Sequence, residues 1–399
     1  MILIALASIG GSLALLVVLI LIYYSLEARR QGFSVISQNL EYFSEITYLD
    51  SNNVTIAPSL EDVRFLKLPL IGLVSREGSL ILGGPVIHHQ NTITRSVADI
   101  KGKIQQGARV RTDVFIHQKN PMYSIGLDYS EITFKSELGE LEAWTIPGSG
   151  KTWIICVHGH RSNRRESLRF SPLFESMGLD QMLMKYRNDA DSPVDKGGYH
   201  MFGLTEWRDL EDAVKYVINQ GAENVFILGH SMGGSIALQF ILKSDLRSHI
   251  TGVILESPAL DLNGIITAKA KALPFPATTL LPPIKKMVSK LVNLEWSDLN
   301  YISKASEIEP PILLIHSKND KTVPVAQSDE FANGIPHLFE YLRLEGAPHA
   351  AAWNFSQHKV ESLIKTFIAS MFSETNTKKY KPLSIAVIHC PLIKTPLEE

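Results

Sequence analysis

Short apolar runs alternate with longer amphipathic stretches from about residue 127 to residue 372. The segment from Trp207 to Asn219 places its apolar residues on one face of a helix, and its first turn is acidic. The apolar runs predict buried strands near Trp153, Met182, Val225, Val253, Ile312 and Phe339. Strands that alternate with helices predict an α/β fold, with a mostly parallel sheet and helices on both faces.

The region from about residue 33 to residue 126 has a different pattern. Its apolar runs are short and broken by turn residues, at Phe65–Leu68, Gly72–Val74, Leu80–Gly84 and Val110–Ile116. Such runs predict a small β-rich domain, in which we find no chemical motif. The next two runs, Glu131–Lys135 and Glu140–Thr145, predict a hairpin that opens the α/β region.

A long insertion separates the strand that ends near Glu256 from the strand that begins at Ile312. It is rich in proline and contains two helical stretches, near Leu262–Ala272 and Ile284–Val292. We expect residues 258–310 to form a lid. The C-terminal tail, residues 373–399, is polar and then apolar, and its pattern predicts no role.

The first 24 residues carry no charged side chain. As a helix they span about 36 Å, enough to cross a bilayer. A signal peptide would need a basic start and a small-residue cleavage site at its end, whereas Ala5-Leu6-Ala7 comes too early. We therefore expect a retained single-pass transmembrane anchor at residues 1–25. Arg29 and Arg30 follow it, which places the rest of the chain in the cytoplasm.

Composition narrows the function classes. The net charge of −2 over 399 residues argues against a nucleic-acid partner, which would need a basic surface. The two cysteines, Cys156 and Cys390, give neither a disulfide framework nor a zinc or redox motif. His158 and His160 have the spacing of a ligand pair, but no third ligand accompanies them, so we expect no metal and no cofactor.

A candidate nucleophile lies between a predicted strand, Asn224–Leu228, and a predicted helix, Ser235–Leu242. The turn between them is Gly229-His230-Ser231-Met232-Gly233, a G-x-S-x-G pattern. In this setting the pattern predicts a sharp bend that exposes the hydroxyl of Ser231. The alternative is a serine with only a structural role in the turn.

A serine nucleophile needs a base and a group that orients the base. Asp320 follows the predicted strand Pro311–His316, and His349 follows the predicted strand Phe339–Leu344. Serine, acid and histidine thus occur in the chain order of α/β-hydrolases. Asp320 has the alternative of capping a turn or helix, and the rivals of His349 are His337 and His358.

These residues predict acyl transfer through a covalent intermediate. His349 would take the proton of Ser231, and Asp320 would hold the imidazole in the right tautomer. The backbone N–H groups of Met232 and His160 would form the oxyanion hole, with Gly159 allowing close approach. We expect no role for the His160 side chain.

A basic cluster of Arg161, Arg164, Arg165 and Arg169 follows this loop. It fits either an anionic substrate or lipid headgroup, or a solvated helix face shared with Glu166. The segment Tyr186–Asp189 lies at the carboxyl end of a predicted strand, where we expect it to support the site loops.

Several runs carry a family resemblance that covers most of residues 127–372. They are Val157–His160, Arg164–Arg169, Tyr186–Asp189, Thr205–Glu211, the Ser231 turn, Glu256–Asp261, Asp320–Pro324 and His349–Asn354. In these runs the chain resembles a membrane-anchored bacterial group of α/β-hydrolase-fold serine hydrolases. The resemblance implies the fold and a serine triad but no particular substrate. Two departures are Ser317 and Pro348, where the family usually has glycine.

We therefore expect a membrane-anchored serine hydrolase, esterase or lipase-like, that cleaves an ester, thioester or amide. The substrate would be a small-molecule or lipid acyl compound. An acyltransferase or a serine peptidase would use the same triad, and a non-catalytic scaffold is a further alternative. The sequence leaves the oligomeric state open.

Overall fold

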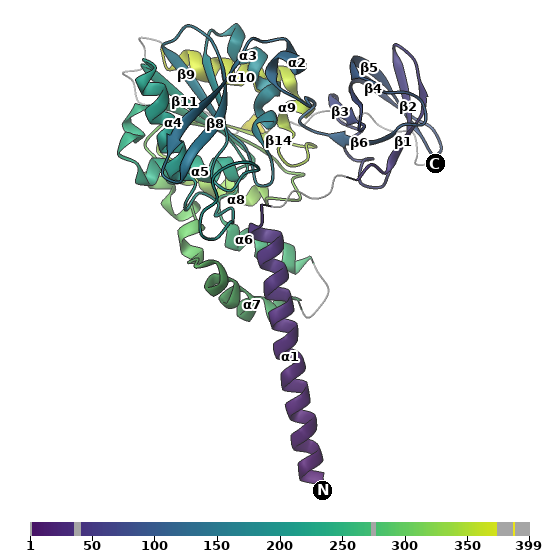
Figure 1. The fold of residues 1–399 in the computed structure, drawn as a ribbon, viewed down its shortest axis with the longest axis vertical. Helices are drawn as coiled ribbons and strands as arrows, with labels where there is room; N and C mark the ends of the chain where they lie inside the picture. Colours follow the sequence, from purple (N-terminus) through teal and green to yellow (C-terminus); the bar gives the residue numbers. More distant parts are fainter. Residues whose placement is uncertain (1, 36–40, 273–276, 373–385, 388–399) are drawn as a thin grey trace.

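A computed structural model describes residues 2–35, 41–272, 277–372 and 386–387. The side chains of residues 2–11, 13, 14, 277, 386 and 387 are outside this description. The chain forms a long N-terminal helix, a β-barrel and an α/β domain (Figure 1).

The α/β domain is built on a nine-stranded sheet with the order β15-β14-β13-β12-β11-β9-β10-β8-β7. The strands from β9 to β15 run parallel, and β8 joins them antiparallel beside β10. Their bounds are β7 Ser130–Ser136, β8 Gly139–Ile146, β9 Thr152–Val157, β10 Asp180–Met184, β11 Asn224–His230, β12 Ile250–Glu256, β13 Ile312–Ser317, β14 Leu338–Leu344 and β15 Ala386–Val387. The predicted α/β fold with a mostly parallel sheet is confirmed.

Helices cover both faces of the sheet. Because successive strand residues point to opposite faces, Ile227 joins one core cluster while Phe226 and Leu228 join the other. The first cluster lies under α4 (Trp207–Asn219), α5 (Met232–Lys243) and α8 (Val325–Gly334), and the second under α3 (Ser171–Ser176) and α10 (Gln357–Ser370). Shorter helices are η1 (Arg164–Phe170), η2 (Asp245–His249), α2 (Pro121–Ile125) and α9 (Ala352–Phe355).

Six strands close the barrel in the order β1-β2-β5-β4-β3-β6. They are β1 Ser44–Leu49, β2 Asn53–Ala57, β3 Ile71–Val74, β4 Gly78–His88, β5 Ile93–Gly102 and β6 Arg109–Asp113. The prediction of a strand at Phe65–Leu68 is wrong, because this segment forms turns whose Leu66 and Leu68 fill the barrel core. The buried guanidinium of Arg95 donates to the carbonyls of Leu66 and Pro69, which supplies the partners that a strand ladder would otherwise give.

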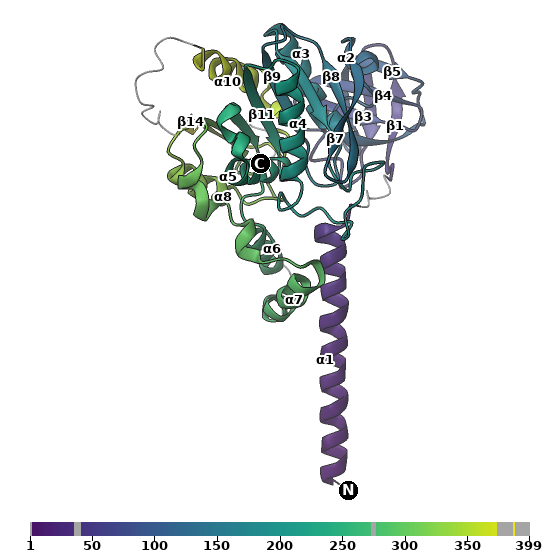
Figure 2. The same cartoon turned by 60° about the vertical axis from the view of Figure 1, so that its left-hand side comes forward.

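Helix α1 (Ile2–Phe33) projects from the α/β domain, and α7 (Ala277–Val292) lies beside it (Figures 1 and 2). The last residue of α1, Phe33, is fully buried, and its ring centre lies 6.1 Å from that of Phe202. The predicted lid contains α6 (Leu262–Lys271), α7, η3 (Trp296–Leu299) and η4 (Ile302–Glu307). Helix α7 runs through Pro282 and Pro283, although we predicted a start after them.

No helix within the described part is both long and apolar enough to cross a membrane. The predicted anchor at residues 1–25 falls partly outside that part, since Met1 and most side chains up to residue 14 are not described. The anchor therefore stays a prediction. The same holds for the C-terminal tail, of which only Ala386 and Val387 are described.

Candidate active site

Ser231 occupies a strained turn between β11 and α5. Its φ of 52° and ψ of −112° lie where a side chain is rarely tolerated. The crossing of β9 explains the glycine at 233, because a Cβ there would lie 2.1 Å from the carbonyl oxygen of Val157. The chain therefore bends sharply and leaves the hydroxyl of Ser231 at the tip of the turn, as the G-x-S-x-G pattern predicts.

The structure brings Ser231, His349 and Asp320 together. The Oγ of Ser231 lies 2.9 Å from Nε2 of His349, and Nδ1 of His349 lies 2.6 Å from Oδ2 of Asp320. Asp320 follows β13 and His349 follows β14, so both lie at the carboxyl edge of the sheet. The rivals do not share this place: His337 precedes β14 and His358 lies in α10, both exposed.

All the acceptor positions of Asp320 are used. Its Oδ1 accepts from the amides of Thr322 and Val323 at 2.7 and 3.0 Å. Its Oδ2 accepts from His316 at 3.0 Å as well as from His349. Burial raises the pKa of Asp320, but the hydrogen bonds from the two imidazoles outweigh burial and hold the pKa well below its usual value. Asp320 is therefore a carboxylate throughout the physiological range.

His316 is a residue that our sequence reasoning missed. It is fully buried near the end of β13, and its Nδ1 lies 2.7 Å from the Oγ of Ser328. With Ser328 donating to Nδ1, the proton of His316 sits on Nε2 and points at Asp320. The signal was an imidazole at the end of an apolar strand, four residues before the acid.

Neither departure from the family pattern disturbs this geometry. Ser317 ends β13 without a left-handed φ, and its Oγ accepts from the amide of Asn319 at 3.3 Å. Pro348 accepts from the amide of Ala351 at 3.3 Å. The positive φ angles of this loop belong to Gly346, with φ 112°, and Ala350, with φ 48°, so glycine is not needed at position 348.

The predicted oxyanion donors lie against the nucleophile. Met232 is the first residue of α5, and a helix start leaves its first amides without intrahelical partners. On the other side, a Cβ at Gly159 would lie 3.3 Å from the Cβ of Ser231. Within the described residues, neither the Met232 nor the His160 amide donates a hydrogen bond to another group. Both are thus available to an oxyanion.

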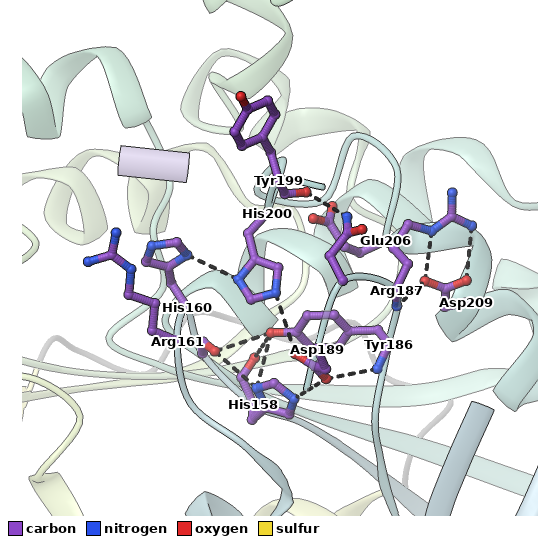
Figure 3. A network of polar contacts seen from close by, with 12 residues as sticks. His158, His160, Arg161, Tyr186, Arg187, Asp189, Tyr199, His200, Glu206 and Asp209 are labelled. Atoms are coloured by element: carbon purple, nitrogen blue, oxygen red, sulfur yellow. Dashed lines mark hydrogen bonds and ion pairs between the residues drawn. The ribbon is translucent and has the colours of Figure 1, made fainter. Parts of the chain in front are cut away.

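A buried polar network supports the loop that carries His160 (Figure 3). Nε2 of His158 lies 2.8 Å from Oδ2 of Asp189, and Nε2 of His200 lies 3.4 Å from the other oxygen. Nδ1 of His200 in turn lies 3.2 Å from Nδ1 of His160. The hydroxyl of Tyr186 donates to the carbonyl of Gly159 at 3.1 Å. Tyr186 and Asp189 thus have the supporting position that the sequence predicted.

The charges in this network are unequal. Burial disfavours the charged forms, but the His158–Asp189 pair overcomes it: the pKa of Asp189 falls to about 2 and that of His158 is raised. His160 has no carboxylate partner, and burial lowers its pKa to about 3. His158 and His160, the pair weighed as metal ligands, therefore contact different partners, and His160 is neutral.

The basic cluster is not a solvated face. Arg169 and Glu166 are buried, and Arg169 forms an ion pair of 2.9 Å with the buried Glu256. Arg161 donates to the carbonyls of Arg30 and Ser34 at 2.6 and 2.9 Å, which ties the end of α1 to the loop after His160. Arg164 and Arg165 bond to Glu131 and to the carbonyl of His117. These guanidiniums hold neighbouring segments to the site.

Glu256 is a second residue that we missed. It ends β12 behind the Ser231 turn, where its Oε2 lies 2.7 Å from Nδ1 of His230. Burial raises the pKa of Glu256, but Arg169 and His230 lower it to about 2. A carboxylate at the end of a fully apolar strand was the signal.

Comparisons with known proteins match this domain. A model of the serine aminopeptidase S33 family matches residues 151–304. The phospholipase YtpA of Bacillus subtilis (strain 168) is 28% identical over 228 residues, 49% of this chain and 86% of that protein. The uncharacterized protein YqkD of the same organism is 24% identical over 227 residues, 56% and 73% of the two chains. The monoglyceride lipase of Saccharomyces cerevisiae is 20% identical over 276 residues, 57% and 87%.

A solved structure shares the fold. The Pyrococcus furiosus esterase Pf2001 superposes with a TM-score of 0.50 at 22% identity, covering 63% of this chain and 96% of that one. The strand order, the strained serine turn and the match over residues 151–304 together show the α/β-hydrolase fold, which this esterase shares.

Proposed function

We propose that the protein is a serine hydrolase that cleaves carboxylic esters of lipids through an acyl-enzyme on Ser231. The observation that carries this proposal is the continuous chain of hydrogen bonds from Ser231 through His349 to Asp320. A serine hydroxyl becomes a useful nucleophile only beside such an oriented base. Asp320, the third residue of this hydrogen-bonded chain, stabilises the imidazolium that forms when His349 takes the proton.

In the proposed mechanism, the Oγ of Ser231 attacks the ester carbonyl while its proton moves to Nε2 of His349. The negative charge on the carbonyl oxygen is met by the amides of Met232 and His160, each worth about 2.7–4 kcal/mol in the transition state. His349 then returns the proton to the leaving alcohol. Water, activated by His349, hydrolyses the acyl-enzyme and restores Ser231.

Two observations support a lipid substrate. Two relatives are named as a phospholipase and a monoglyceride lipase. In addition, apolar side chains of α1 between residues 15 and 24 are exposed, Leu15 at 60% and Tyr23 at 64%. An exposed apolar run of this kind is typical of a surface that a partner or a membrane covers. Together with the uncharged first 24 residues, it supports a membrane anchor.

Orientation in that membrane follows from the charges after the anchor. We infer that the catalytic domain faces the cytoplasm, because Arg29 and Arg30 follow the apolar run. A cysteine in place of Leu60, which is 97% exposed, tests this inference. A membrane-impermeant maleimide should label Leu60→Cys only after the cells are permeabilised, and labelling of intact cells would reverse the orientation.

The test of the proposed chemistry is labelling by a fluorophosphonate probe. The full-length protein should label, whereas Ser231→Ala and His349→Ala should not. Esters of graded acyl length then define the substrate. Absence of labelling in the folded, unmodified protein would favour a non-catalytic scaffold.

The matched family model makes a serine aminopeptidase the second candidate. Such an enzyme needs an acidic group to hold the amino terminus of its substrate. The helices α6 and α7 of the lid favour the opposite charge, because residues 262–294 contain lysines but no Asp or Glu, although Asp261 and Glu295 flank this segment. Aminoacyl anilides separate the two functions, and faster cleavage of these than of matched esters would favour the peptidase.

A further inference from the structure

We propose that α6 and α7 form a docking surface for the anionic phospholipid headgroups of the membrane that holds α1. This inference rests on the proposed anchoring of α1 and names the partner of the lid. The surface, named the basic lid, comprises the described residues 262–272 and 277–294.

The charge of the basic lid is one-sided. Residues 262–294 contain five lysines and no Asp or Glu, in a chain whose net charge is −2. Four of the lysines have exposed side chains, Lys269, Lys271, Lys286 and Lys290. Among the described residues, these four take part in no ion pair. A concentrated positive field of this kind favours an anionic partner.

The fifth lysine shows what a structural role looks like. Lys285 donates to the carbonyl of Asn263 and to the hydroxyl of Thr267, and its ammonium lies 5.9 Å from the ring centre of Trp296. It joins α6, α7 and η3. Lys271, Lys286 and Lys290 therefore stand out as unused by the fold, whereas Lys269 interacts electrostatically with Asp320.

The place of the basic lid relative to α1 identifies the partner. Leu21 and Ala28 of α1 pack against the core cluster that includes Ile284 and Val288 of α7, and Ser25 between them is fully buried. These α1 residues share one helical face. The uncharged run ends at Tyr24, so α7 meets α1 at the end of the proposed span, where the headgroups lie.

Two further features agree with an interfacial position. Tyr23 and Tyr24 are exposed, and tyrosines are enriched at the membrane–water boundary. Leu291, near the end of α7 and directly after Lys290, is 42% exposed and can enter the headgroup region. Lysines beside exposed apolar residues are the composition of a helix that lies on an anionic bilayer.

Docking would also serve the active site. Helix α6 begins directly after Asp261, whose amide and carbonyl are both held by the side chain of Gln327. Gln327 belongs to α8, which follows the loop of Asp320. The amide of Ala259, just before α6, donates to the carbonyl of Ser231. The basic lid thus begins at residues that border the active site. When it is docked on the bilayer, the active site would face the lipid esters there.

The experiment compares two substrates and two triple variants. Full-length protein is reconstituted into vesicles of phosphatidylcholine alone or with one third phosphatidylglycerol. Hydrolysis is measured on a bilayer ester and on water-soluble p-nitrophenyl acetate. One variant replaces Lys271, Lys286 and Lys290 with glutamine, and the control replaces Lys135, Lys243 and Lys365, which are exposed elsewhere.

We expect phosphatidylglycerol to raise hydrolysis of the bilayer ester for the unmodified protein and the control, and high salt to remove the gain. The lid variant should lose the gain, since each lysine contributes about fivefold to docking and three contribute about 100-fold. Hydrolysis of p-nitrophenyl acetate should be equal in all three proteins. An equal gain in the lid variant, or an equal loss in the control, overturns the docking surface.

A second readout does not depend on catalysis. In a Ser231→Ala, Cys390→Ser background, an environment-sensitive dye on Leu291→Cys reports contact of α7 with lipid, because Cys156 is buried. Its emission should shift to the blue in phosphatidylglycerol vesicles and lose that shift in the lid variant. A shift in this background, combined with no ester hydrolysis by the unmodified protein, would sink the proposed enzyme but keep the docking surface. Hydrolysis by the unmodified protein without a shift in this background would do the reverse.

Discussion

Two buried carboxylates flank the site, and each faces two imidazoles. Asp320 contacts His349, which in turn contacts the proposed nucleophile, Ser231. The side chain of His349 is 21% exposed. Asp189 contacts His158, whose side chain is only 1% exposed. His158 lies beside the loop of His160, whose amide is the second proposed oxyanion donor. Both units pair a carboxylate with an imidazole, but we assign them different roles. The imidazole of the Asp320 unit can reach Ser231 and a substrate, so it is the proposed base. The imidazole of the Asp189 unit cannot, and this unit supports a loop.

The largest effect should come from Asp320→Asn. The amide keeps the shape of the side chain but no longer stabilises the imidazolium of His349, and it can favour the wrong tautomer. We expect kcat to fall about 10⁴-fold with little change in KM. Steady-state hydrolysis of a soluble ester measures this, with circular dichroism to verify that the variant is folded.

If Asp320→Asn loses less than tenfold, Asp320 is not the orienting acid. A second carboxylate near His349 would then have to take its place. The described structure offers none at hydrogen-bond distance from that imidazole other than Asp320.

Asp189→Asn should have the next effect, a fall in kcat of about 10- to 100-fold. It removes the partner of the His158 imidazolium and loosens the loop of the His160 amide, while Ser231, His349 and Asp320 stay in place. Because breaking a buried pair leaves a charge without a partner, we also expect a loss of stability of about 3–5 kcal/mol. Denaturant unfolding and fluorophosphonate labelling measure the two effects separately.

Asp189→Asn also predicts a change with pH. The folded-state pKa of Asp189 is lowered to about 2, so its contribution to stability is present above its unfolded pKa, near 4, and is lost as the pH falls toward 2. The variant should therefore lose less of its melting temperature between pH 5 and pH 3 than the unmodified protein. Parallel curves for the two proteins would contradict a charged Asp189.

The sequence predicted the residues with a fixed chain order but not the contacts between residues that meet only in space. Ser231, Asp320 and His349 each follow a strand, and parallel strands end at one edge, so the pattern alone put them near each other. The helix Trp207–Asn219 was predicted with its observed bounds, because a period of 3.6 residues is a local signal. His158, Asp189 and His200 come from loops with no fixed spacing, and their contacts depend on the folded path of each loop.

The barrel shows the same limit from another side. Phe65–Leu68 has the composition of a strand but forms turns, since the partner that holds it, Arg95, is distant in the sequence. No local pattern announces a buried guanidinium.

His316 sharpens the comparison at a smaller scale. His316→Leu removes one of the two imidazole hydrogen bonds at Oδ2 of Asp320, so this oxygen is left to stabilise the protonated form of His349. We expect kcat to fall about tenfold and the acidic limb of the kcat/KM profile to move to higher pH. His316→Gln, which offers an N–H at a similar position, should restore the limb. A merely structural role would lower the yield of folded protein without moving the limb.

The smallest effect is expected for His160→Gln, which tests whether the backbone or the imidazole of this residue serves the site. The side chain contacts His200 at 3.2 Å and stacks on Phe202 with ring centres 5.3 Å apart, so it packs beside the network without joining the carboxylate. Burial lowers its pKa to about 3, and the imidazole of His160 therefore stays neutral between pH 5 and pH 9. Glutamine keeps a hydrogen-bonding group toward His200 and leaves the amide at position 160 unchanged.

For His160→Gln we expect less than a threefold change in kcat and a pH profile that overlays that of the unmodified protein. A displaced limb would mean that His160 titrates in the working range and that the two carboxylate units are coupled through it, whereas overlaid profiles keep proton transfer on the Asp320 side alone.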